Sequence, residues 1–351
     1  MPDVSHHQPR HGVPPGPFER VLGGLYGAVC GDALGAVTEM LSRDQVTATY
    51  GRLERMVAPD LSPFAAGRAA GQITDDASQL IVLARTVART ERLTAADVAA
   101  ALLEWAADEE MLRRFAGPTT RAAITQLREG ADPIAVGRES AGFMRGTSDG
   151  AAMKVAPVGW VHAGDPAAAA LDAVTVCLPT HATRVAIAGA CAIACGIAAA
   201  MKPGADVVSV TRGCLWGAVE GERLGLEHGR DVAGPSVSER IRLGVSLAIS
   251  SRDEWEAVDR IAAILGAGLH TAEAVPAAVA AFVAGGGRPR ETIVTAANLG
   301  DDTDTVACMA GALAGTLGGI DAIPADWRTL VTTANGLDLE PLAAALVARN
   351  G

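Results

Sequence analysis

The sequence Gly300-Asp301-Asp302-Thr303-Asp304-Thr305 runs directly into an apolar segment, Val306–Leu317, which predicts a buried helix. Three carboxylates and two hydroxyls crowd the start of that helix, and burying such charges unpaired is very costly. One explanation is helix capping, although a cap uses one or two such residues rather than five. The other is a hard cation that prefers oxygen ligands, such as Mg²⁺. This stretch alone leaves both explanations open.

A second acidic stretch of the same form lies far upstream, in Gly71-Gln72-Ile73-Thr74-Asp75-Asp76. It opens a segment whose apolar residues fall on one helix face, and its Thr and Asp could again serve only as caps. If the two helix starts meet, four carboxylates repel one another unless cations lie between them, and two divalent ions would roughly balance the charge. The residues that would converge are Thr74, Asp75, Asp76, Asp302, Asp304 and Thr305.

Near the N-terminus, the segment Phe18–Leu34 predicts a helix with glycines spaced four residues apart, which places them on one helix face. Glycine lowers helix propensity, so this face indicates that another backbone approaches closely. The glycines are Gly23, Gly27, Gly31 and Gly35. Glu39 follows among apolar and small residues, and by itself it could equally be a solvated loop carboxylate.

The composition favours a helical protein. Of 351 residues, 49% are apolar and only 3% aromatic, with 40 glycines. Small side chains of this kind suit close helix packing better than a bulky β-sandwich core. We find no run of alternating strand residues, no repeat of fixed period and no Pro/Ser-rich linker. We therefore expect an all-α fold, with a disordered arm over residues 1–17 and a single compact helical domain over residues 18–351.

Periodic apolar residues predict further helices along the chain. Thr94 is the expected N-cap of one of them, and prolines mark the first turn of two others. The expected helices span 94–108, 118–128, 133–140, 165–178, 182–201, 206–222, 237–249, 254–267, 272–284 and 290–298, with two more between 324 and 349.

Charge and cysteine content restrict the partners and the compartment. A formal net charge of −11 argues against nucleic acid as a partner. The six cysteines are scattered through apolar segments without a Cys-x-x-Cys pair, which predicts buried free thiols and a reducing, cytoplasmic location. The segment Val185–Met201 is apolar but Ala-rich and slightly short for a membrane span, so we expect a core helix and no membrane association.

The loop 145–157 could bind an anionic group. It contains glycines and leads into a helix of small residues, an arrangement that can direct backbone N–H groups at phosphate oxygens. Most such loops are simply turns. His181 at a later helix start could reach a ligand, although a locally hydrogen-bonded histidine is the commoner case.

Taken together, these motifs resemble the ADP-ribosylglycohydrolase family, and they occur in the family's order from about residue 20 to residue 330. The matching pieces are Gly31–Gly35 with Glu39, Gly71–Asp76, Ser148–Lys154, Thr180-His181, and Asn298–Thr305 continuing into Ala310–Ala312. The resemblance implies an orthogonal all-α fold with a dinuclear Mg²⁺ or Mn²⁺ centre. The metal ligands it implies are Thr74, Asp75, Asp76, Asp302, Asp304 and Thr305.

The resemblance also implies a reaction, the hydrolysis of the ribosyl C1″ glycosidic bond of an ADP-ribosylated protein or a small ADP-ribosyl compound. Nearby carboxylates would stabilise oxocarbenium charge, and one of Glu39, Asp75 and Asp76 would accept a proton from water. Which of the three does so stays open. The implied ligand-binding residues are Ser148, Asp149, Gly150, Ala151, Met153 and His181.

Two departures from the family pattern keep other functions in view. Asp301 stands where many members have glycine, so it either faces outward or tunes metal or substrate preference. The loop before Gly150 lacks the aromatic residue on which some members stack adenine, although Phe143 is near. One alternative is therefore a glycosidase of a small nucleoside-like or ribosyl metabolite. The other is a non-catalytic protein of this family that only binds ADP-ribose or serves a structural role.

Overall fold

The protein is built from helices throughout the part of the chain that the computed structural model describes, residues 14–138 and 146–350. Within these residues there are eighteen α-helices, one π-helical turn and one 3₁₀ turn, and no β-strand beyond two isolated bridges. The helices are α1 (Pro17–Gly35), α2 (Arg43–Tyr50), α3 (Asp75–Arg89), α4 (Ala95–Trp105), α5 (Glu109–Arg114), α6 (Pro118–Arg128), α7 (Pro133–Arg138), α8 (Ala156–Val161), α9 (Pro166–Cys177), α10 (Arg184–Ala200), α11 (Val207–His228), α12 (Val237–Ile249), α13 (Glu254–Arg260), α14 (Thr271–Ala284), α15 (Pro289–Ala297), α16 (Thr303–Gly318), α17 (Ala325–Asn335) and α18 (Glu340–Ala348). The π-helical turn is Ile261–Leu265 and the 3₁₀ turn is Ile320–Ala322.

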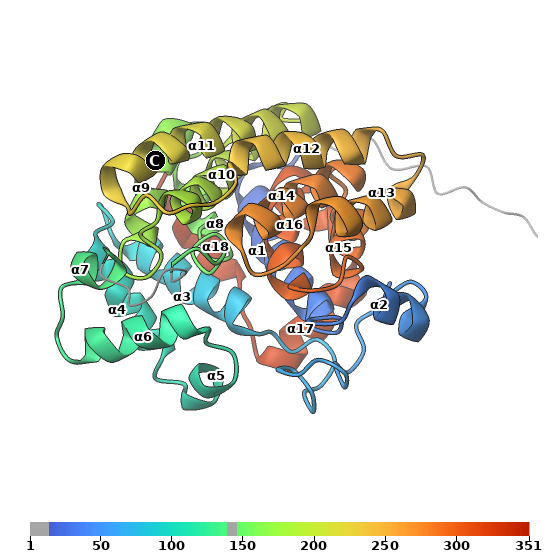
Figure 1. The fold of residues 1–351 in the computed structure, drawn as a ribbon, viewed down its shortest axis with the longest axis horizontal. Helices are drawn as coiled ribbons and strands as arrows, with labels where there is room; N and C mark the ends of the chain where they lie inside the picture. Colours follow the sequence, from blue (N-terminus) through green and yellow to red (C-terminus); the bar gives the residue numbers. More distant parts are fainter. Residues whose placement is uncertain (1–13, 139–145, 351) are drawn as a thin grey trace, which may run out of the picture.

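The centre of the fold is the antiparallel pair α1 and α16, which come from opposite ends of the chain and lie side by side (Figure 1). Their backbones touch along a glycine seam, which we define as the four α1 glycines that face α16. A Cβ on Gly27 would overlap the carbonyl oxygen of Gly311, and a Cβ on Gly35 would overlap that of Thr303. The close approach expected from the glycine spacing is therefore confirmed. The seam consists of Gly23, Gly27, Gly31 and Gly35.

The large core surrounds α10, which is buried along almost its whole length. Helix α11 packs on it through Gly217 and Gly221, at both of which a Cβ would collide with the α10 backbone. The expectation of a core helix in this apolar segment is confirmed. No helix in the described residues is both long and apolar enough to cross a membrane.

Helices α4, α6 and α7 form a smaller unit with a hydrophobic cluster of its own, at the lower left of Figure 1. Leu102 and Trp105 of α4 pack there with Ile124 of α6 and Val136 of α7. The connection between α5 and α6 lines the same cavity as Asp75 and Asp76 at the start of α3. This unit therefore supplies a second side to any site at that helix start.

Most of the helices expected from periodicity are present, with bounds within a few residues, and Thr94 caps α4 as predicted. Two short helices, α2 and α5, were not anticipated, whereas α8 is the helix expected after the loop 145–157. Helices α2 and α5 have only eight and six residues, too few for an apolar period to emerge. Helix α11 extends six residues further than expected, to His228. Most of the arm expected over residues 1–17 lies outside the described residues, and α1 begins at Pro17.

We predict that Gly27→Ala destabilises the protein by about 2 kcal/mol, because its methyl group must push two helix backbones apart. Alanine favours a helix by about 1 kcal/mol over glycine. A lower free energy of unfolding in this variant would therefore come from the collision between the backbones. Urea unfolding followed by circular dichroism measures the difference.

Gly117→Ala is the matched control, because Gly117 has an ordinary backbone conformation and open space around its Cβ position. We expect its free energy of unfolding to stay within about 1 kcal/mol of the original, the usual effect at a helix N-cap. Equal stability of the Gly27 and Gly117 variants would contradict the close contact.

Candidate active site

Three chain segments meet at one cavity of about 390 Å³: the end of α1 with the turn after it, the start of α3 and the start of α16. The two acidic stretches, more than 200 residues apart, therefore lie together as the sequence predicted. Six carboxyl groups line the cavity; one of them, Asp149, belongs to the loop after Gly146, and we refer to the other five as the acidic cluster. They are Glu39, Asp75, Asp76, Asp302 and Asp304.

Most of the other predicted site residues also lie at this cavity. Thr305 adjoins the acidic cluster, and the loop after Gly146 supplies the neighbouring part of the lining. Thr74 and Ala151 are buried behind the lining and do not form part of it. The predicted residues that line the cavity beside the acidic cluster are Thr305, Ser148, Asp149, Gly150, Met153 and His181.

Asp32 is a buried carboxylate of α1 that the sequence analysis quoted within a motif but did not include in the site. It accepts hydrogen bonds from the backbone N–H of Thr74 (3.0 Å), the hydroxyl of Thr74 (2.9 Å) and the N–H of Ala77 (2.9 Å). Asp32 therefore satisfies the free N–H groups at the start of α3. The signal in the sequence was a charged residue in an otherwise apolar, glycine-rich helix.

Capping does not account for the carboxylates of α16. Asp302 occupies the N-cap position, yet its side chain accepts no capping hydrogen bond. Four buried carboxylate oxygens around the cavity have no hydrogen-bond partner within the protein, and an unsatisfied buried polar atom is costly. These oxygens are Asp76 Oδ1, Asp149 Oδ2, Asp302 Oδ2 and Asp304 Oδ1.

Unpartnered carboxylate oxygens beside threonine hydroxyls are the donor set that Mg²⁺ and Mn²⁺ accept, so the residues fit a hard divalent cation. Among residues 14–138 and 146–350, no group of three or more His, Cys, Asp or Glu side chains is placed so that it could hold a metal ion by itself. A cation held here would therefore complete its shell with threonine, water or substrate oxygens, and Mg²⁺ commonly keeps several waters.

Burial and mutual repulsion raise the pKa values of the carboxyl groups. Burial, followed by the charge of Asp304, raises the pKa of Asp32 to about 7 and that of Glu39 to about 10. The pKa values of Asp75 and Asp76 are raised well above their usual range by the same two causes. Without a cation the site therefore holds protons near neutral pH, and a bound cation would displace them.

Asp149 joins the loop after Gly146 to the acidic cluster. Burial raises the pKa of Asp149 to about 7 and also raises that of Asp302; the hydrogen bond between the two then lowers the first and raises the second. The backbone N–H of Asp149 donates to the carbonyl of Leu269 (3.1 Å), which fixes the loop against the segment before α14. The predicted ligand loop and the predicted metal side are thus in direct contact.

His181 contacts the same loop through a hydrogen bond with Ser148. Its Nε2 lies 3.0 Å from the Ser148 hydroxyl, and its Nδ1 lies 2.7 Å from the Thr180 hydroxyl. Burial, followed by the charge of Lys154, lowers the pKa of His181 to about 3, so the ring is neutral. A Cβ on Gly150 would meet this ring, which explains the glycine at that position.

Glu39 and Asp301 lie in adjoining turns with different orientations. The Ser62 hydroxyl donates to Glu39 Oε2 (2.9 Å) and holds this carboxyl at the cavity. Asp301 has a left-handed backbone (φ 65°), a conformation that glycine adopts most easily. Its side chain is largely exposed, and its partial burial, followed by the charge of Glu273, raises its pKa. Of the two alternatives for Asp301, the structure supports the outward-facing one.

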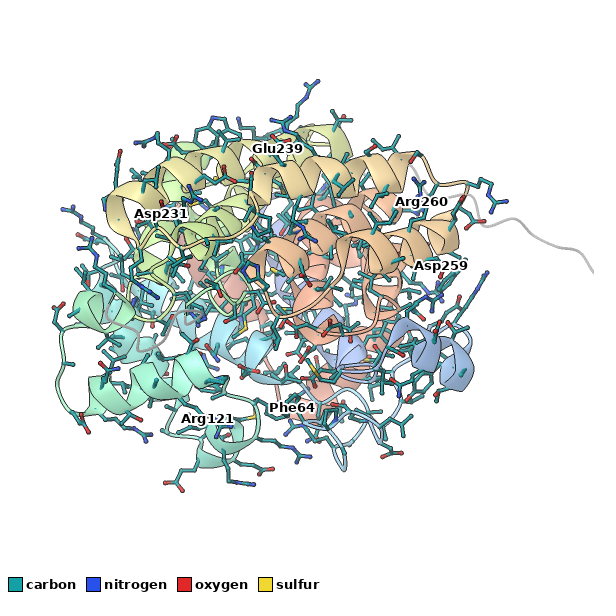
Figure 2. All side chains as sticks on the ribbon, in the orientation of Figure 1. Phe64, Arg121, Asp231, Glu239, Asp259 and Arg260 are labelled. Atoms are coloured by element: carbon teal, nitrogen blue, oxygen red, sulfur yellow. The ribbon has the colours of Figure 1, made fainter. Side chains whose placement is uncertain are left out.

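The opposite side of the cavity was not predicted. We call it the outer wall and define it as Phe64 with residues 114–121. The Arg114 guanidinium donates to the carbonyls of Phe64 and Ala66 and lies over the Phe115 ring, which ties the two segments together. Figure 2 shows Phe64 and Arg121 near the same edge of the molecule. Phe143, the aromatic residue near the loop, lies outside the described residues.

Comparison with known proteins identifies the family of the chain. The ADP-ribosylglycohydrolase family model matches residues 14–351. The YegU protein of Escherichia coli K12 is 29% identical over 337 residues, which cover 93% of this chain and 96% of YegU. The ADP-ribosyl-[dinitrogen reductase] glycohydrolase of Rhodospirillum rubrum is 29% identical over 157 residues, which cover 44% of this chain and 48% of that protein.

A solved structure described as an ADP-ribosylglycohydrolase-related protein complex has the same fold, with a TM-score of 0.70 and 24% identity over 95% of this chain and 99% of that one. The fold and the family match together define an all-helical glycohydrolase. The chain belongs to the ADP-ribosylglycohydrolase family, which is named for hydrolysis of ADP-ribose glycosidic bonds. The family, the all-α fold and the enzyme class expected from the sequence are thereby confirmed.

We predict that the metal-free protein loses stability as the pH rises from about 4 to about 8. The folded-state pKa values of Asp32 and Asp149, about 7, exceed the ordinary value of 3.8, so the folded state holds these protons more tightly than the unfolded state. This contribution to stability is complete below about pH 4 and is lost as the pH rises through about 7. Mn²⁺ should therefore raise the Tm more at about pH 8 than at about pH 5.

Thermal unfolding in EDTA and in Mn²⁺ across this pH range measures both effects. Asp149→Asn should flatten the pH dependence in EDTA, whereas Asp44→Asn, at an exposed carboxylate of α2, should leave it unchanged. A Tm in EDTA that rises over the same interval would contradict the prediction.

Proposed function

We propose that this protein is a hydrolase that depends on two Mg²⁺ or Mn²⁺ ions and cleaves the ribosyl C1″ glycosidic bond of an ADP-ribosylated substrate. The observation that carries the proposal is the set of buried, unpartnered carboxylate oxygens from α3, the loop after Gly146 and α16 around one cavity. The residues that would hold the ions are Thr74, Asp75, Asp76, Asp302, Asp304 and Thr305.

When bound, the ions supply Lewis-acid attraction for the ribose hydroxyls and favour ionisation of a nearby water. The protein's own carboxylates stabilise the oxocarbenium charge that develops as the C1″ bond breaks. One of Glu39, Asp75 and Asp76 accepts the proton of the attacking water, since all three line the cavity. Ser62 holds the Glu39 carboxyl in place for this role.

The loop of Ser148, Asp149, Gly150, Ala151 and Met153 is the proposed binding segment for the ADP part of the substrate, with neutral His181 beneath it. Neutral His181 hydrogen-bonds Ser148 and so positions this loop without adding a positive charge beside it. The modified acceptor then faces the outer wall, on the other side of the cavity. Arginine or a similar acceptor group on a protein is the proposed leaving group.

A small nucleoside-like or ribosyl metabolite is the second candidate substrate. The specific observation in its favour is that residues 146–153 of the loop contain no Phe, Tyr or Trp on which an adenine ring could stack. Calorimetry with ADP-ribose in Mg²⁺ separates the two candidates, since tight binding of ADP-ribose supports the first and no binding supports the second.

We expect the purified protein to release ADP-ribose from ADP-ribosyl-arginine or from an ADP-ribosylated protein in Mg²⁺ or Mn²⁺, and to lose this activity in EDTA. Chromatography of released ADP-ribose measures the reaction, and restoring the metal should restore it. Absence of metal-dependent release from any linkage, including a small ribosyl substrate, would rule out the proposal.

We further predict that Asp302→Asn and Asp75→Asn each lower turnover by roughly 100-fold or more, because loss of a ligand removes several kcal/mol of transition-state stabilisation. Both variants should weaken Mn²⁺ binding and keep the helical circular dichroism spectrum. Unfolding of both variants even in excess metal would indicate a purely structural role for these carboxylates.

A further inference from the structure

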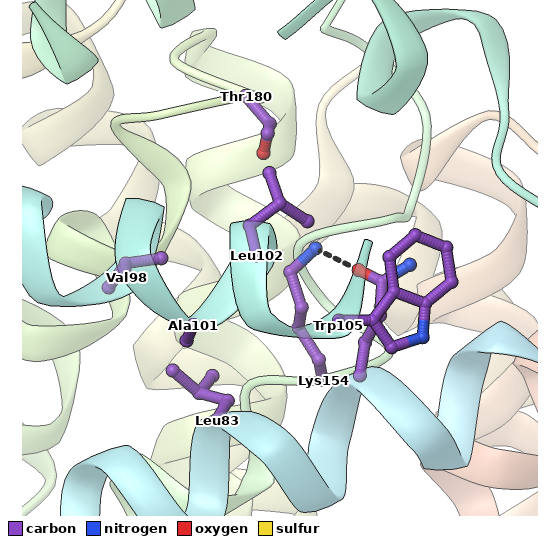
Figure 3. A pocket seen from close by; sticks show the side chains of 8 residues that line it. Leu83, Val98, Ala101, Leu102, Trp105, Lys154 and Thr180 are labelled. Atoms are coloured by element: carbon purple, nitrogen blue, oxygen red, sulfur yellow. Dashed lines mark hydrogen bonds between the residues drawn. The ribbon is translucent and has the colours of Figure 1, made fainter. Parts of the chain in front are cut away.

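Lys154 is a fully buried cation directly behind the cavity that the proposed chemistry does not use. It ends the loop after Gly146, just before α8, and only 4% of it is exposed. Its ammonium donates to Gln79 Oε1 at 2.7 Å. The dashed line from Lys154 in Figure 3 marks a hydrogen bond. The chain has one other lysine, Lys202, which is exposed at the end of α10.

Gln79 connects Lys154 to the acidic cluster. It lies one helical turn after Asp75 in α3, and its Nε2 donates to Asp75 Oδ2 at 3.0 Å. A lysine ammonium can only donate, so it fixes the amide with the oxygen towards Lys154 and the NH₂ group towards Asp75. The three side chains therefore form a hydrogen-bonded chain with one direction.

The side chains around the Lys154 ammonium are mainly apolar. Beside it is a cavity of about 20 Å³, room for about one water molecule, lined mainly by apolar side chains such as Leu83, Leu102 and Trp105 (Figure 3). Burial lowers the pKa of Lys154 to about 8, although the charge of Asp75 opposes this. Burying an ammonium in such a place does not favour folding, so the stability of the protein does not explain the presence of Lys154 there.

We propose that Lys154 is a positioning residue for Asp75, acting through Gln79. The hydrogen bonds from Lys154 through Gln79 hold Asp75 Oδ2 against α3. Asp75 Oδ1 is therefore left as the oxygen that a cation in the cavity can bind. This inference rests on the proposed function, because it assigns Asp75 as a metal ligand. Removing a residue that hydrogen-bonds to a metal ligand and fixes its orientation commonly lowers metal affinity by about 10- to 100-fold.

The alternative role is a simple counter-charge for the acidic cluster, and it predicts the opposite sign. If Lys154 only supplied positive charge, its removal would strengthen the attraction of the cluster for a divalent cation. If Lys154 orients Asp75, its removal weakens cation binding in spite of the lost repulsion. The direction of the change therefore separates the two roles.

The test is calorimetric titration of Mn²⁺ into the full-length protein and its Lys154→Met, Gln79→Met and double variants. We expect each single variant to bind Mn²⁺ about tenfold or more weakly, and the double variant to bind no more weakly than the weaker single variant. Lys202→Met is the matched control and should bind Mn²⁺ like the original protein. Circular dichroism checks that each variant is folded.

Unchanged or tighter Mn²⁺ binding by the Lys154 variant would overturn the inference, as would losses that multiply in the double variant. If the Lys154 variant does not fold, Gln79→Met decides the matter, since it keeps the buried charge and breaks only the connection. Unchanged Mn²⁺ binding by Gln79→Met then overturns the inference. If the original protein binds no Mn²⁺, the proposed metal site is itself wrong and the inference falls with it.

Discussion

The contact between the backbones of α1 and α16 is the constraint on which the rest of the structure depends. The glycine seam allows one register between these helices, since any side chain on Gly27 or Gly35 would collide with a carbonyl. Asp32 lies in the last turn of α1 and Glu39 in the turn after it, while Asp302 and Asp304 lie at the start of α16. A shift of one helical turn, about 5.4 Å, would separate these carboxyl groups. The packing of small residues thus sets distances in the proposed centre.

The acidic cluster itself opposes folding in the absence of a cation. Its carboxyl groups are buried and repel one another, and several of their oxygens find no partner in the protein. The large apolar core around α10 supplies stability that offsets this unfavourable burial and repulsion. An arrangement that costs stability and is surrounded by compensating packing is characteristic of a functional site.

The sequence predicted the parts of the site that local patterns mark, and the structure explains the rest. Six acidic or hydroxyl residues at two helix starts stood out because caps do not need so many, and five of them line one cavity while Thr74 lies just behind it. Gln79 and Lys154 gave no such signal, since a lone polar residue in a helix or a loop is usually exposed. The outer wall was also missed, because its residues approach the cavity only through the packing of α4 and α6.

The cavity has two sides that belong to different hydrophobic cores. The carboxyl side is anchored in the large core, whereas the outer wall is carried largely by a connection whose supporting helices pack around Leu102 and Ile124. Substitutions within this smaller unit would therefore alter the support of the outer wall. Under the proposed function, the catalytic carboxylates and the surface that meets the acceptor thus rest on separate hydrophobic clusters, which makes the smaller unit the place where acceptor preference would be altered.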